Sequence, residues 1–467
     1  MTRAVVVGGG LSGLVAAREL VVHHGIASGD VTVLEARERA GGVLLRGEVA
    51  GRTVDLGAES VLTTRPEATD LLAELGLAEE AVHPTGVPAA VWSRGGIHPV
   101  PRGTLMGVPG DAAQAAGLLT EQEVDRADDS GREHPPLVED VSLGDLVAER
   151  MGDAVVDRLV EPLLGGVYAG HARRLSVRAC LPALAEAAAE GRSLTEAVQA
   201  ATARSGGGTQ ARPAPPFASL PGGLARLVEA LTDDLVARGV RVRTGTPVEA
   251  VTRTDGGWEV RAAGQALPAD AVLLAVPAPA AAALLRPELP AAADELAAVP
   301  TASMVVVTFA FPTAAMPPLD RSGFLVPPVD GRAIKASTFL SAKWPGVGDD
   351  EVTLVRASLG RAGDDLSDRT DDELGALALA DVAQAVAEHT GADLPAPLEV
   401  RVQRWPDGLP QYEVGHLERM ARVADAVAAV PGLELAGSVY DGVGIPACIG
   451  TARAAAARLV AGGRMGA

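Results

Sequence analysis

The sequence predicts an α/β protein in which a Rossmann-like domain is built from three chain segments, next to an α+β domain with a helical subdomain. Residues 4–34 read strand, glycine turn, helix and strand, and αβ patterns recur near residues 222–244 and 433–460. The chain has 467 residues, of which 48% are hydrophobic, so it is too long for one ordinary domain. We therefore expect two or three domains with large cores.

The elements follow from hydrophobic patterning and from turn residues. For the Rossmann-like domain we expect, in order, a strand at 4–7, a helix at 11–22, a strand at 31–34, a helix at 224–238, strands at 240–244, 248–252, 258–262 and 271–275, a strand at 433–436 and a helix from about Ile449 to Val460. Between these segments, residues 105–208 read mainly helical and residues 302–359 mainly strand, before a helix near 371–389.

These patterns divide the chain into three parts. The assigned ranges are 1–80, 215–290 and 400–467 for the Rossmann-like domain, 81–100 and 291–399 for the α+β domain, and 101–214 for the helical subdomain. A formal net charge of -20 argues against nucleic-acid and anionic-lipid partners, which need clustered Lys and Arg. The chain has no apolar run long enough for a transmembrane helix and opens directly in a strand, so we expect a soluble, cytoplasmic protein.

Composition gives no sign of a metal centre or a disulfide framework. Cys180 and Cys448 are far apart in the sequence and match no ligand spacing, and the eight histidines are scattered. No nucleophile–base or paired-carboxylate pattern stands out either. We therefore assign no metal ligand and no catalytic side chain.

The strongest local motif is the glycine turn that follows the first strand. Gly8, Gly9, Gly10, Leu11, Ser12 and Gly13 form a G-x-G-x-x-G string between a strand and a helix. In a dinucleotide site the first glycine permits the tight turn, the second admits the pyrophosphate, and the third allows helix and strand to pack closely. Glu35 ends the next strand, where a carboxylate can accept hydrogen bonds from ribose hydroxyls. Strand, helix and Glu35 together favour a dinucleotide site over an ordinary tight turn.

The residues after Glu35 indicate which dinucleotide is bound. Glu35, Ala36, Arg39, Gly41 and Gly42 belong to an E-x-x-x-R-x-G-G string, followed by Val43, and the string resembles the flavin amine oxidase superfamily. That resemblance implies FAD, bound non-covalently, with the arginine and glycines beside the diphosphate. It also implies a flavin-contacting turn at Gly57, Ala58, Glu59 and Ser60, and a backbone contact from Val248 to the adenine. Val248 fits plain strand core equally well.

Longer motifs resemble one family within that superfamily, the protoporphyrinogen and coproporphyrinogen oxidases. The matching stretches are 161–170, 175–179, 219–224, 404–412 and 435–446, so the resemblance spans nearly the whole chain in order. His171, Ser438 and Ala447 depart from the family's usual residues, which leaves flavin binding intact and puts detailed substrate contacts in doubt. Of the two substrates, we expect coproporphyrinogen III, with protoporphyrinogen IX as the alternative.

The family resemblance implies a reaction and a set of contacts. The reaction is an O2-dependent, six-electron oxidation of the porphyrinogen that releases three H2O2 in haem biosynthesis, with flavin N5 accepting hydride. Ser438, Val443, Gly444 and Ile445 should contact the flavin. The helix that follows would direct its positive end at the reduced flavin. Trp405 could pack on the flavin or form a wall of the pocket, and it fits ordinary core packing equally well. The resemblance also implies a ferrochelatase as a candidate recipient of the product.

The substrate pocket should combine apolar walls with cations for the propionates. Phe324, Leu325 and Val326 are the candidate apolar wall, and the family resemblance implies that the Gly166 carbonyl faces the pyrrole N–H groups. Arg178 and Arg356 are the candidate propionate partners. Core packing for the apolar residues and a solvated surface position for either arginine remain alternatives.

Two other functions are compatible with the FAD motif. An amine oxidase would need a lysine near flavin N5, and Lys335 or Lys343 could serve. The covalent-flavin string Ser-Gly-Gly-Cys of many amine oxidases is absent from the sequence. A non-catalytic FAD-bound scaffold would show no turnover with O2.

Overall fold

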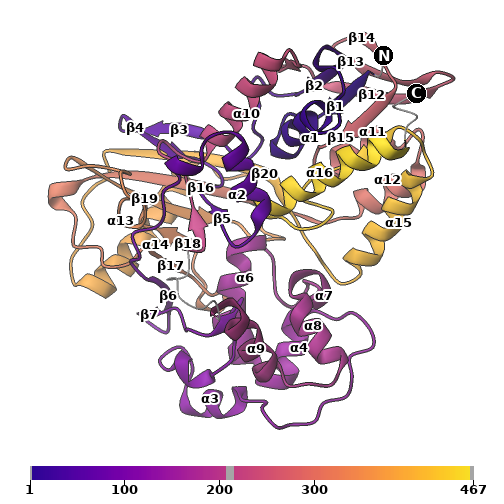
Figure 1. Cartoon of the computed structure of the whole chain (residues 1–467). Helices are drawn as coiled ribbons and strands as arrows, with labels where there is room; N and C mark the ends of the chain where they lie inside the picture. Colours follow the sequence, from indigo (N-terminus) through magenta and orange to yellow (C-terminus); the bar gives the residue numbers. More distant parts are fainter. Residues whose placement is uncertain (1–2, 207–214, 463–467) are drawn as a thin grey trace.

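A computed structural model describes residues 3–206 and 215–462 of the chain (Figure 1). Its first sheet has five parallel strands in the order β11-β2-β1-β15-β21. These strands are β1 (Ala4–Val7), β2 (Val31–Leu34), β11 (Arg241–Arg243), β15 (Ala271–Leu274) and β21 (Leu433–Leu435). They come from three distant stretches of sequence, so the α/β class and the three-segment assembly predicted for the Rossmann-like domain are confirmed.

The parallel sheet is the middle of three layers. Val6 of β1 faces a helical layer, whereas Val5 and Val7 face the opposite layer, because successive strand side chains point to opposite sides. The first layer contains α1 (Leu11–Val22), α2 (Pro66–Glu74), α10 (Ala225–Arg238) and α16 (Ile445–Gly462). The second contains the antiparallel strands β12 (Val248–Thr254), β13 (Gly257–Ala262) and β14 (Gln265–Ala269), with α11 (Ala278–Leu285), α12 (Pro290–Ala297) and α15 (His416–Ala428).

The last helix begins earlier than the sequence predicts. We expected its start near Ile449, but α16 begins at Ile445. Pro446 lies in the first turn, which tolerates proline because the first N–H groups of a helix have no partner within the helix. The earlier start brings the N-terminus of α16 directly to the end of the glycine-rich crossing at 437–444.

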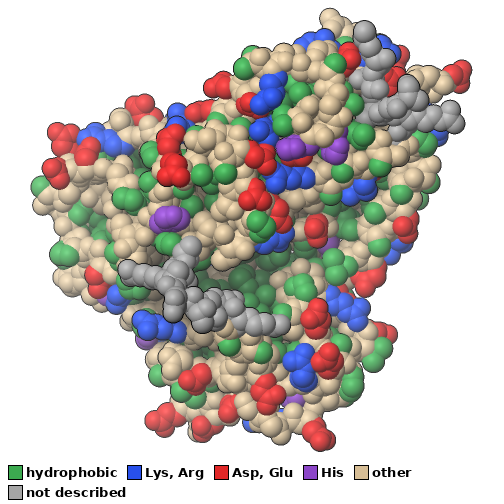
Figure 2. Space-filling model, in the orientation of Figure 1, with side chains coloured by type: hydrophobic (Ala, Val, Ile, Leu, Met, Phe, Trp, Pro, Cys, Tyr) green, Lys and Arg blue, Asp and Glu red, His purple; other side chains and the backbone are tan. Residues whose placement is uncertain are grey.

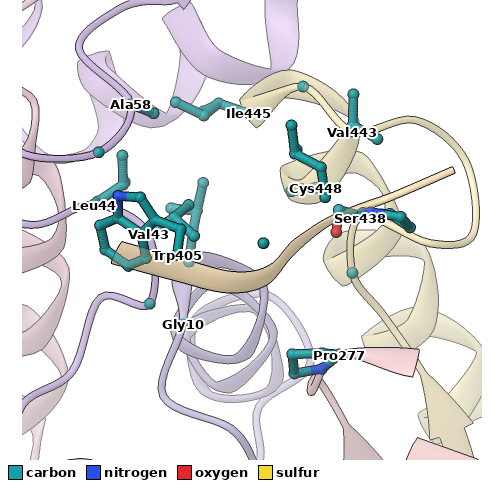
Figure 3. Close-up of a pocket in the computed structure, with 18 of the residues that line it drawn as sticks. Gly10, Val43, Leu44, Ala58, Pro277, Trp405, Ser438, Val443, Ile445 and Cys448 are labelled. Atoms are coloured by element: carbon teal, nitrogen blue, oxygen red, sulfur yellow. The ribbon is translucent and has the colours of Figure 1, made fainter. Parts of the chain in front are cut away.

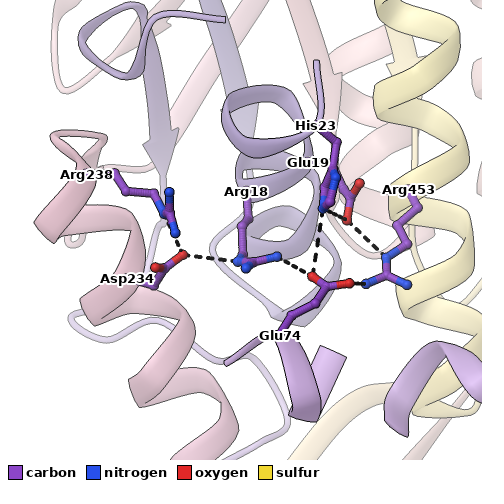
Figure 4. Close-up of polar contacts among 7 residues, drawn as sticks. All are labelled: Arg18, Glu19, His23, Glu74, Asp234, Arg238 and Arg453. Carbon is purple, nitrogen blue, oxygen red and sulfur yellow. Dashed lines mark hydrogen bonds and ion pairs between the residues drawn. The ribbon is translucent and has the colours of Figure 1, made fainter. Parts of the chain in front are cut away.

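An ion network joins the helices of the first layer (Figure 4). Arg18 of α1, which is buried, donates hydrogen bonds to Glu74 of α2 and, at 3.0 Å, to Asp234 of α10. Arg453 of α16 donates to Glu19 at 3.0 Å and to Glu74 at 2.6 Å. The network therefore holds together helices from all three segments. Glu19, His23 and Glu74 lie close enough to share a cation, but the arginines already occupy both carboxylates, so we assign the group to helix packing.

A second, larger sheet has seven strands in the order β20-β16-β19-β18-β17-β6-β7. One of its faces packs against α14 (Asp371–Thr390), and these residues form a separate hydrophobic core. The strands are β6 (Ala89–Ser93), β7 (Gly96–Pro99), β16 (Thr301–Pro312), β17 (Gly323–Leu325), β18 (Ile334–Thr338), β19 (Val352–Leu359) and β20 (Glu399–Pro410), and α13 (Leu340–Lys343) follows β18. The predicted strand character of 302–359 is confirmed.

The region drawn at the bottom of Figure 1 is mainly helical, as the sequence predicts for the residues after Leu105. Its elements are β8 (Thr104–Leu105), β9 (Val108–Pro109), α3 (Glu121–Ala127), α4 (Leu143–Met151), α5 (Asp153–Val155), a π-helical turn (Val156–Val160), α6 (Glu161–Tyr168), α7 (Val177–Cys180), α8 (Pro182–Ala189) and α9 (Leu194–Gly206). They share one hydrophobic core.

Short elements link the three regions. The hairpin of β3 (Arg46–Val49) and β4 (Arg52–Asp55) precedes β5 (Val61–Leu62), which pairs with β10 (Phe217–Ala218). The boundaries of the proposed three-part division stay predictions: α12 packs in the core beside the parallel sheet, and β20 pairs with β16 in the seven-stranded sheet. The boundary at 214 and the end of the predicted helical stretch at 208 lie outside the described residues. In the part of the chain that the structure describes, no helix has the length and apolar character needed to cross a bilayer.

Candidate functional site

A cavity of about 450 Å³ lies between the carboxyl edge of the parallel sheet and the seven-stranded sheet. Figure 3 shows Trp405, Val43 and Leu44 on one side and Ser438, Val443 and Cys448 on the other. The lining residues come from many segments: Gly10, Leu11, Ser12, Gly41, Gly42, Val43, Leu44, Gly57, Ala58, Ser60, Gly166, Val167, Ala275, Val276, Pro277, Ala278, Thr301, Met304, Val306, Arg356, Trp405, Asp407, Gly408, Leu409, Pro410, Gly437, Ser438, Val439, Val443, Gly444, Ile445 and Cys448. Ligands of open α/β sheets bind at this edge.

The glycine turn fits a dinucleotide site residue by residue. Gly8 has φ +105°, and a Cβ there would lie 2.3 Å from the carbonyl oxygen of Ala275. A Cβ at Gly13 would lie 1.8 Å from the carbonyl oxygen of Gly8. At Gly10, by contrast, the nearest atom to a Cβ is the Cα of Gly42 at 3.9 Å. Gly8 and Gly13 are therefore required by packing, whereas Gly10 presents open backbone to the cavity.

The N-terminus of α1 supplies the donors for a diphosphate. No side chain caps this end of the helix, and Leu11 and Ser12 of its first turn line the cavity. Free N–H groups and the positive end of a helix bind phosphate. The residues present therefore fit a dinucleotide diphosphate.

Glu35 supports the glycine turn directly. Its carboxylate accepts hydrogen bonds from the backbone N–H groups of Gly9, at 2.7 Å, and Arg37, at 2.9 Å. Each carboxylate oxygen has a second lone pair, so ribose hydroxyls can still donate to it. Glu35, Gly9, Ala36 and Val248 lie outside the cavity lining, and their predicted contacts to the adenosine half stay predictions.

Arg39 holds the following loop in shape. Its guanidinium donates to the carbonyl oxygens of Gly42 at 2.9 Å and Ala40 at 3.2 Å, and does not line the cavity. Gly41 has φ +111° and its N–H donates to the carbonyl of Gly9 at 2.8 Å. The loop thereby rests on the glycine turn and brings Gly41 and Gly42 to the cavity.

The turn at Gly57 closes against Trp405. A Cβ at Gly57 would lie 1.8 Å from the carbonyl oxygen of Val43 and 3.1 Å from the indole of Trp405. The indole N–H of Trp405 donates to the carbonyl of Leu56 at 3.0 Å. This bond fixes the ring as a wall of the cavity, where the sequence predicts a flavin contact.

Glu59 is the residue of this turn that faces away from the cavity. Its carboxylate accepts hydrogen bonds from Lys343 at 2.6 Å, Arg356 at 3.1 Å and the indole of Trp344 at 3.3 Å. Burial alone would raise the pKa of Glu59, but Lys343 and Arg356 outweigh it and hold the pKa at about 2. Glu59 therefore anchors the turn to the seven-stranded sheet, while Gly57, Ala58 and Ser60 of the same turn line the cavity.

A buried aromatic pair holds the C-terminal loop. Tyr412 Oη donates to the carbonyl of Ser438 at 2.5 Å and accepts from the N–H of Gly442 at 2.7 Å. The ring of His416 stacks on Tyr412 with centroids 3.9 Å apart, and His416 Nε2 donates to the carbonyl of Val439 at 2.9 Å. Burial lowers the pKa of His416 to about 4, so this imidazole is neutral at pH 7.

The C-terminal loop leads into the N-terminus of α16, and its predicted flavin contacts Ser438, Val443, Gly444 and Ile445 all line the cavity.

The opposite wall comes from the seven-stranded sheet. Met304 and Val306 of β16 line the cavity, while Val305 and Val307 face the core with α14, as strand alternation requires. Arg356 of β19 lines the cavity and donates to the carbonyl of Gly57 at 2.7 Å. The middle of this wall is therefore apolar with one cation, and Thr301 of β16 and Asp407 of β20 add polar groups to the lining.

The predicted apolar residues of β17 point to different sides. Phe324 packs edge-on against Trp92, and Val326 is fully buried in the core with α14. Leu325 is half-buried and faces Gly166, where a Cβ would lie 3.6 Å from its side chain. The alternation of strand side chains thus leaves Leu325 as the one of the three that faces α6, and Gly166 and Val167 of α6 line the cavity.

The two candidate propionate partners are separated in the structure. Arg178 lies on α7, where its guanidinium donates to the carbonyl of Val138 at 2.6 Å and lies 3.7 Å from Glu418. Its side chain is 35% exposed and does not line the cavity. Arg356 alone of the pair lines the cavity.

Lys335 and Lys343 also occupy different surroundings. Lys343 is paired with Glu59. Lys335 is buried, donates to the carbonyl of Gly360 at 3.0 Å, and lies 3.2 Å from the sulfur of Met304, which lines the cavity. Burial lowers the pKa of Lys335 to about 7, and the charges of Arg361 and Arg356 act in the same direction.

Several lining residues were not predicted. Ala275–Ala278 follow β15 at the edge that carries the glycine turn, so the end of that predicted strand was an available signal. Met304, Thr301 and Cys448 gave no comparable signal, because only the folded arrangement of β16 and α16 brings them to the cavity.

Comparisons with known proteins agree with this geometry. A family model described as flavin containing amine oxidoreductase matches residues 11–460. A coproporphyrinogen III oxidase of Mycobacterium tuberculosis is 38% identical over 455 residues, which cover 96% of this chain and 95% of the relative. A coproporphyrinogen III oxidase of Bacillus subtilis is 31% identical over 462 residues, which cover 97% and 96%.

Solved structures extend the comparison. A structure from Exiguobacterium sp. 255-15, named as a candidate protoporphyrinogen oxidase, has a TM-score of 0.84 and 33% identity and covers 98% of both chains. A putrescine oxidase bound to putrescine has a TM-score of 0.69 at 18% identity, covering 98% of this chain and 99% of its own, and shares the fold. The resemblance stated from the sequence motifs is confirmed, and the cofactor of this fold is a flavin.

Proposed function

Because the chain belongs to the flavin-containing amine oxidoreductase family, in its porphyrinogen oxidase branch, we propose that it oxidises coproporphyrinogen III to coproporphyrin III with FAD and O2. One observation supports this most strongly. The cavity runs from the glycine turn at Gly10 to an apolar wall at Val306, and Arg356 adds a cation for a substrate carboxylate. The reaction belongs to haem biosynthesis. We propose a ferrochelatase as the recipient of the product and the cytoplasm as the location of the protein.

The binding residues have separate tasks. Gly10 and the first turn of α1 would hold the diphosphate, and Trp405 with the loop at 443–445 would enclose the ring system. When bound, the flavin supplies hydride acceptance from the substrate and transfer of the electrons to O2. Removing six hydrogens from a porphyrinogen then balances three O2 reduced to three H2O2.

FAD is proposed to bind without a covalent link. Cys448 is the thiol that lines the cavity, and burial raises its pKa to about 11. Attachment to a flavin needs a nucleophilic thiolate, which is scarce at neutral pH under that condition.

The protein's own part in the reaction is positioning and exclusion of water. Among the described residues that line the cavity, the ionisable side chains are Arg356, Asp407 and Cys448. Arg356 is committed to Glu59 and Gly57, and Asp407 is exposed and accepts a hydrogen bond from Thr301 at 2.6 Å. We therefore assign no acid–base role to a side chain and propose that Val306 and Gly166 help to keep the macrocycle in a dry, apolar space.

The second candidate substrate is protoporphyrinogen IX, which the name of the Exiguobacterium structure favours. Coproporphyrinogen carries four carboxylates instead of two, so a strongly cationic pocket would favour it. The described lining offers Arg356 as a cation and Asp407 as an anion, so the preference for coproporphyrinogen rests mainly on the named relatives. Lys343 does not suit the role of the lysine near flavin N5 that an amine oxidase needs, because Glu59 holds its ammonium group outside the cavity. A non-catalytic FAD-bound scaffold would use the open face of Gly10 for the cofactor but would leave the apolar wall at Val306 without a use.

Anaerobic bleaching of the flavin tests the proposal. The purified holoprotein is mixed with coproporphyrinogen III, protoporphyrinogen IX or a panel of amines, and O2 is then admitted. The expected result is fastest bleaching by coproporphyrinogen, followed by coproporphyrin fluorescence with three H2O2 for each porphyrin. Acid precipitation should release all of the flavin as FAD. Bleaching by amines alone would overturn the proposal, and flavin that stays with the precipitate would refute non-covalent binding.

A further inference from the structure

Three buried or half-buried cations lie close together on the strands that form the sheet wall of the cavity. Arg356 lies on β19, Arg361 comes two residues after the end of that strand, and Lys335 lies on the neighbouring strand β18. Lys335 is 5% exposed and Arg361 is 7% exposed. Their charges act on one another, since both arginines disfavour the charged form of Lys335. Gathering like charges in a protein interior is costly unless anions balance them.

Two of the three cations are balanced by nearby carboxylates of the protein. Arg356 is paired with Glu59 at 3.1 Å. Arg361 donates to the carbonyl of Val326 at 2.9 Å and lies in the field of Asp364 and Glu161. Lys335 is different, because its hydrogen bonds go to the carbonyl of Gly360 and the sulfur of Met304. Asp364 is the carboxylate whose charge reaches it, with less effect than either arginine.

Met304 connects this lysine with the cavity. The methionine side chain lines the cavity, and its sulfur lies 3.2 Å from Lys335 Nζ. A thioether is a weak acceptor, and an unbranched side chain can change rotamer at small cost. A carboxylate that enters from the cavity could therefore displace the thioether and take its place on the ammonium group.

We propose that Lys335 is a specificity-determining residue that binds one of the carboxylates that coproporphyrinogen has and protoporphyrinogen lacks. The inference rests on the proposed function. A carboxylate at this point balances the uncompensated cation and forms a charge-assisted hydrogen bond. A vinyl group at the same point contacts the Met304 thioether and leaves the cation unbalanced. The recess of hydrophobic side chains in Figure 2 lies between the helical region and the parts above it, so the macrocycle itself remains in apolar surroundings.

Binding of the oxidised porphyrins by the flavin-loaded protein tests the inference without turnover. Coproporphyrin III and protoporphyrin IX are titrated into wild type, Lys335→Met and Lys335→Arg at pH 6.5, and tryptophan quenching gives the Kd. We expect Lys335→Met to weaken coproporphyrin binding at least tenfold and protoporphyrin binding less than threefold. Lys335→Arg should recover most of the difference, because it keeps the cation.

Lys343→Met is the matched control, since it removes the other lysine of the chain, which pairs with Glu59 outside the cavity. It should leave the ratio of the two Kd values unchanged. Without ligand, Lys335→Met should melt at a higher temperature than wild type, because it replaces an uncompensated buried cation with an apolar side chain. A lysine that serves only the fold would give the opposite change in melting temperature.

Each outcome separates this inference from the proposed function. If wild type binds and oxidises coproporphyrinogen but Lys335→Met keeps the same Kd ratio, the role of Lys335 is overturned and the function stands. If wild type is bleached only by amines, the proposed function fails. If Lys335→Met loses its flavin absorbance, Lys335→Arg and Lys335→Gln replace it in the test. A ratio of the two Kd values that is unchanged in Lys335→Arg but changed in Lys335→Gln would still show that a cation is needed at this position.

Discussion

The wall of the cavity proposed for the nucleotide is made of backbone, whereas the wall proposed for the substrate is made of side chains. Gly10, Gly42 and Gly57 form the first wall: a Cβ is excluded at Gly57, and at Gly10 and Gly42 it would meet no protein atom closer than 3.4 Å. Met304 and Arg356 form the second wall from two neighbouring strands. The backbone wall suits a cofactor shared by a whole family, and the side-chain wall can change its substrate by substitution.

The largest expected effect breaks the backbone wall at Gly13. The Cβ of Gly13→Ala would meet the carbonyl oxygen of Gly8 at 1.8 Å, and backbone on both sides cannot yield. We expect a loss of more than about 4 kcal/mol in the free energy of unfolding, measured by urea denaturation, and no bound flavin.

Gly10→Ala tests cofactor binding separately from folding. Its Cβ meets no protein atom closer than 3.9 Å, so the fold should survive with an unchanged unfolding midpoint. The methyl group enters the space proposed for the diphosphate, and FAD affinity should fall at least 100-fold, or about 2.7 kcal/mol. Normal FAD binding by Gly10→Ala would contradict the assignment of this space.

The backbone wall could be predicted from sequence because its signals are local. The spacing of Gly8, Gly10 and Gly13 encodes a turn with one geometry, and Glu35 follows at the end of the next strand. The three-segment sheet also followed from separate αβ patterns. Local motifs of this kind carry their own structural context.

The side-chain wall was predicted less well because its residues meet only through long-range packing. Phe324, Leu325 and Val326 form one apolar run in the sequence, and strand alternation divides them between the core and α6. Arg178 and Arg356 have the same chemistry, and nothing in the sequence separates a surface helix from a cavity wall. Glu59 was placed in the right turn, but the direction of its side chain depends on Lys343 and Arg356, hundreds of residues later in the chain.

The next largest effect concerns the ion cluster of Glu59, Lys343 and Arg356, which connects the two walls. Glu59→Gln leaves Lys343 and Arg356 without a balancing charge, which should cost about 3–5 kcal/mol in the free energy of unfolding by urea denaturation. Glu351→Gln is the control, since Glu351 is 83% exposed in its pair with Arg52 and should contribute less than about 1 kcal/mol. Equal effects of the two substitutions would mean that the Glu59 cluster does not stabilise the joint.

Removing a hydroxyl group tests how the C-terminal loop is held. Tyr412→Phe leaves the carbonyl of Ser438 and the N–H of Gly442 without their partner, at a cost of about 1–3 kcal/mol. Tyr440→Phe is a matched control, because the buried Tyr440 Oη has no hydrogen-bond partner among the described residues, and its loss should be neutral or stabilising. Thermal unfolding and FAD affinity measure both effects. A Tyr440→Phe variant that is less stable, or binds FAD more weakly, than Tyr412→Phe would contradict the prediction.

The imidazole beneath this loop makes stability depend on pH. The pKa of His416 is about 4 in the folded protein, below its ordinary value of 6.5, because burial disfavours the charged form. Between these values the unfolded chain binds a proton that the folded chain does not, so stability falls as pH falls from 6.5 to 4. His416→Gln keeps a donor for the carbonyl of Val439 and should lose about 1–3 kcal/mol of this pH dependence in urea titrations. An unchanged pH profile would contradict the burial of a neutral imidazole.

The smallest expected effect concerns the arginine that lies outside both walls. Arg178→Gln removes an exposed hydrogen bond to the carbonyl of Val138 and a loose pair with Glu418, so kcat/KM for coproporphyrinogen should stay within about twofold of wild type. Arg356→Gln should lower the same ratio at least tenfold, since this side chain lines the cavity. Because Arg356 also balances Glu59, its unfolding midpoint must be measured alongside, and Arg356→Lys separates charge from hydrogen-bond geometry. A large loss at Arg178 with wild-type stability would place substrate binding on α7, and the side-chain wall would then extend into the helical region.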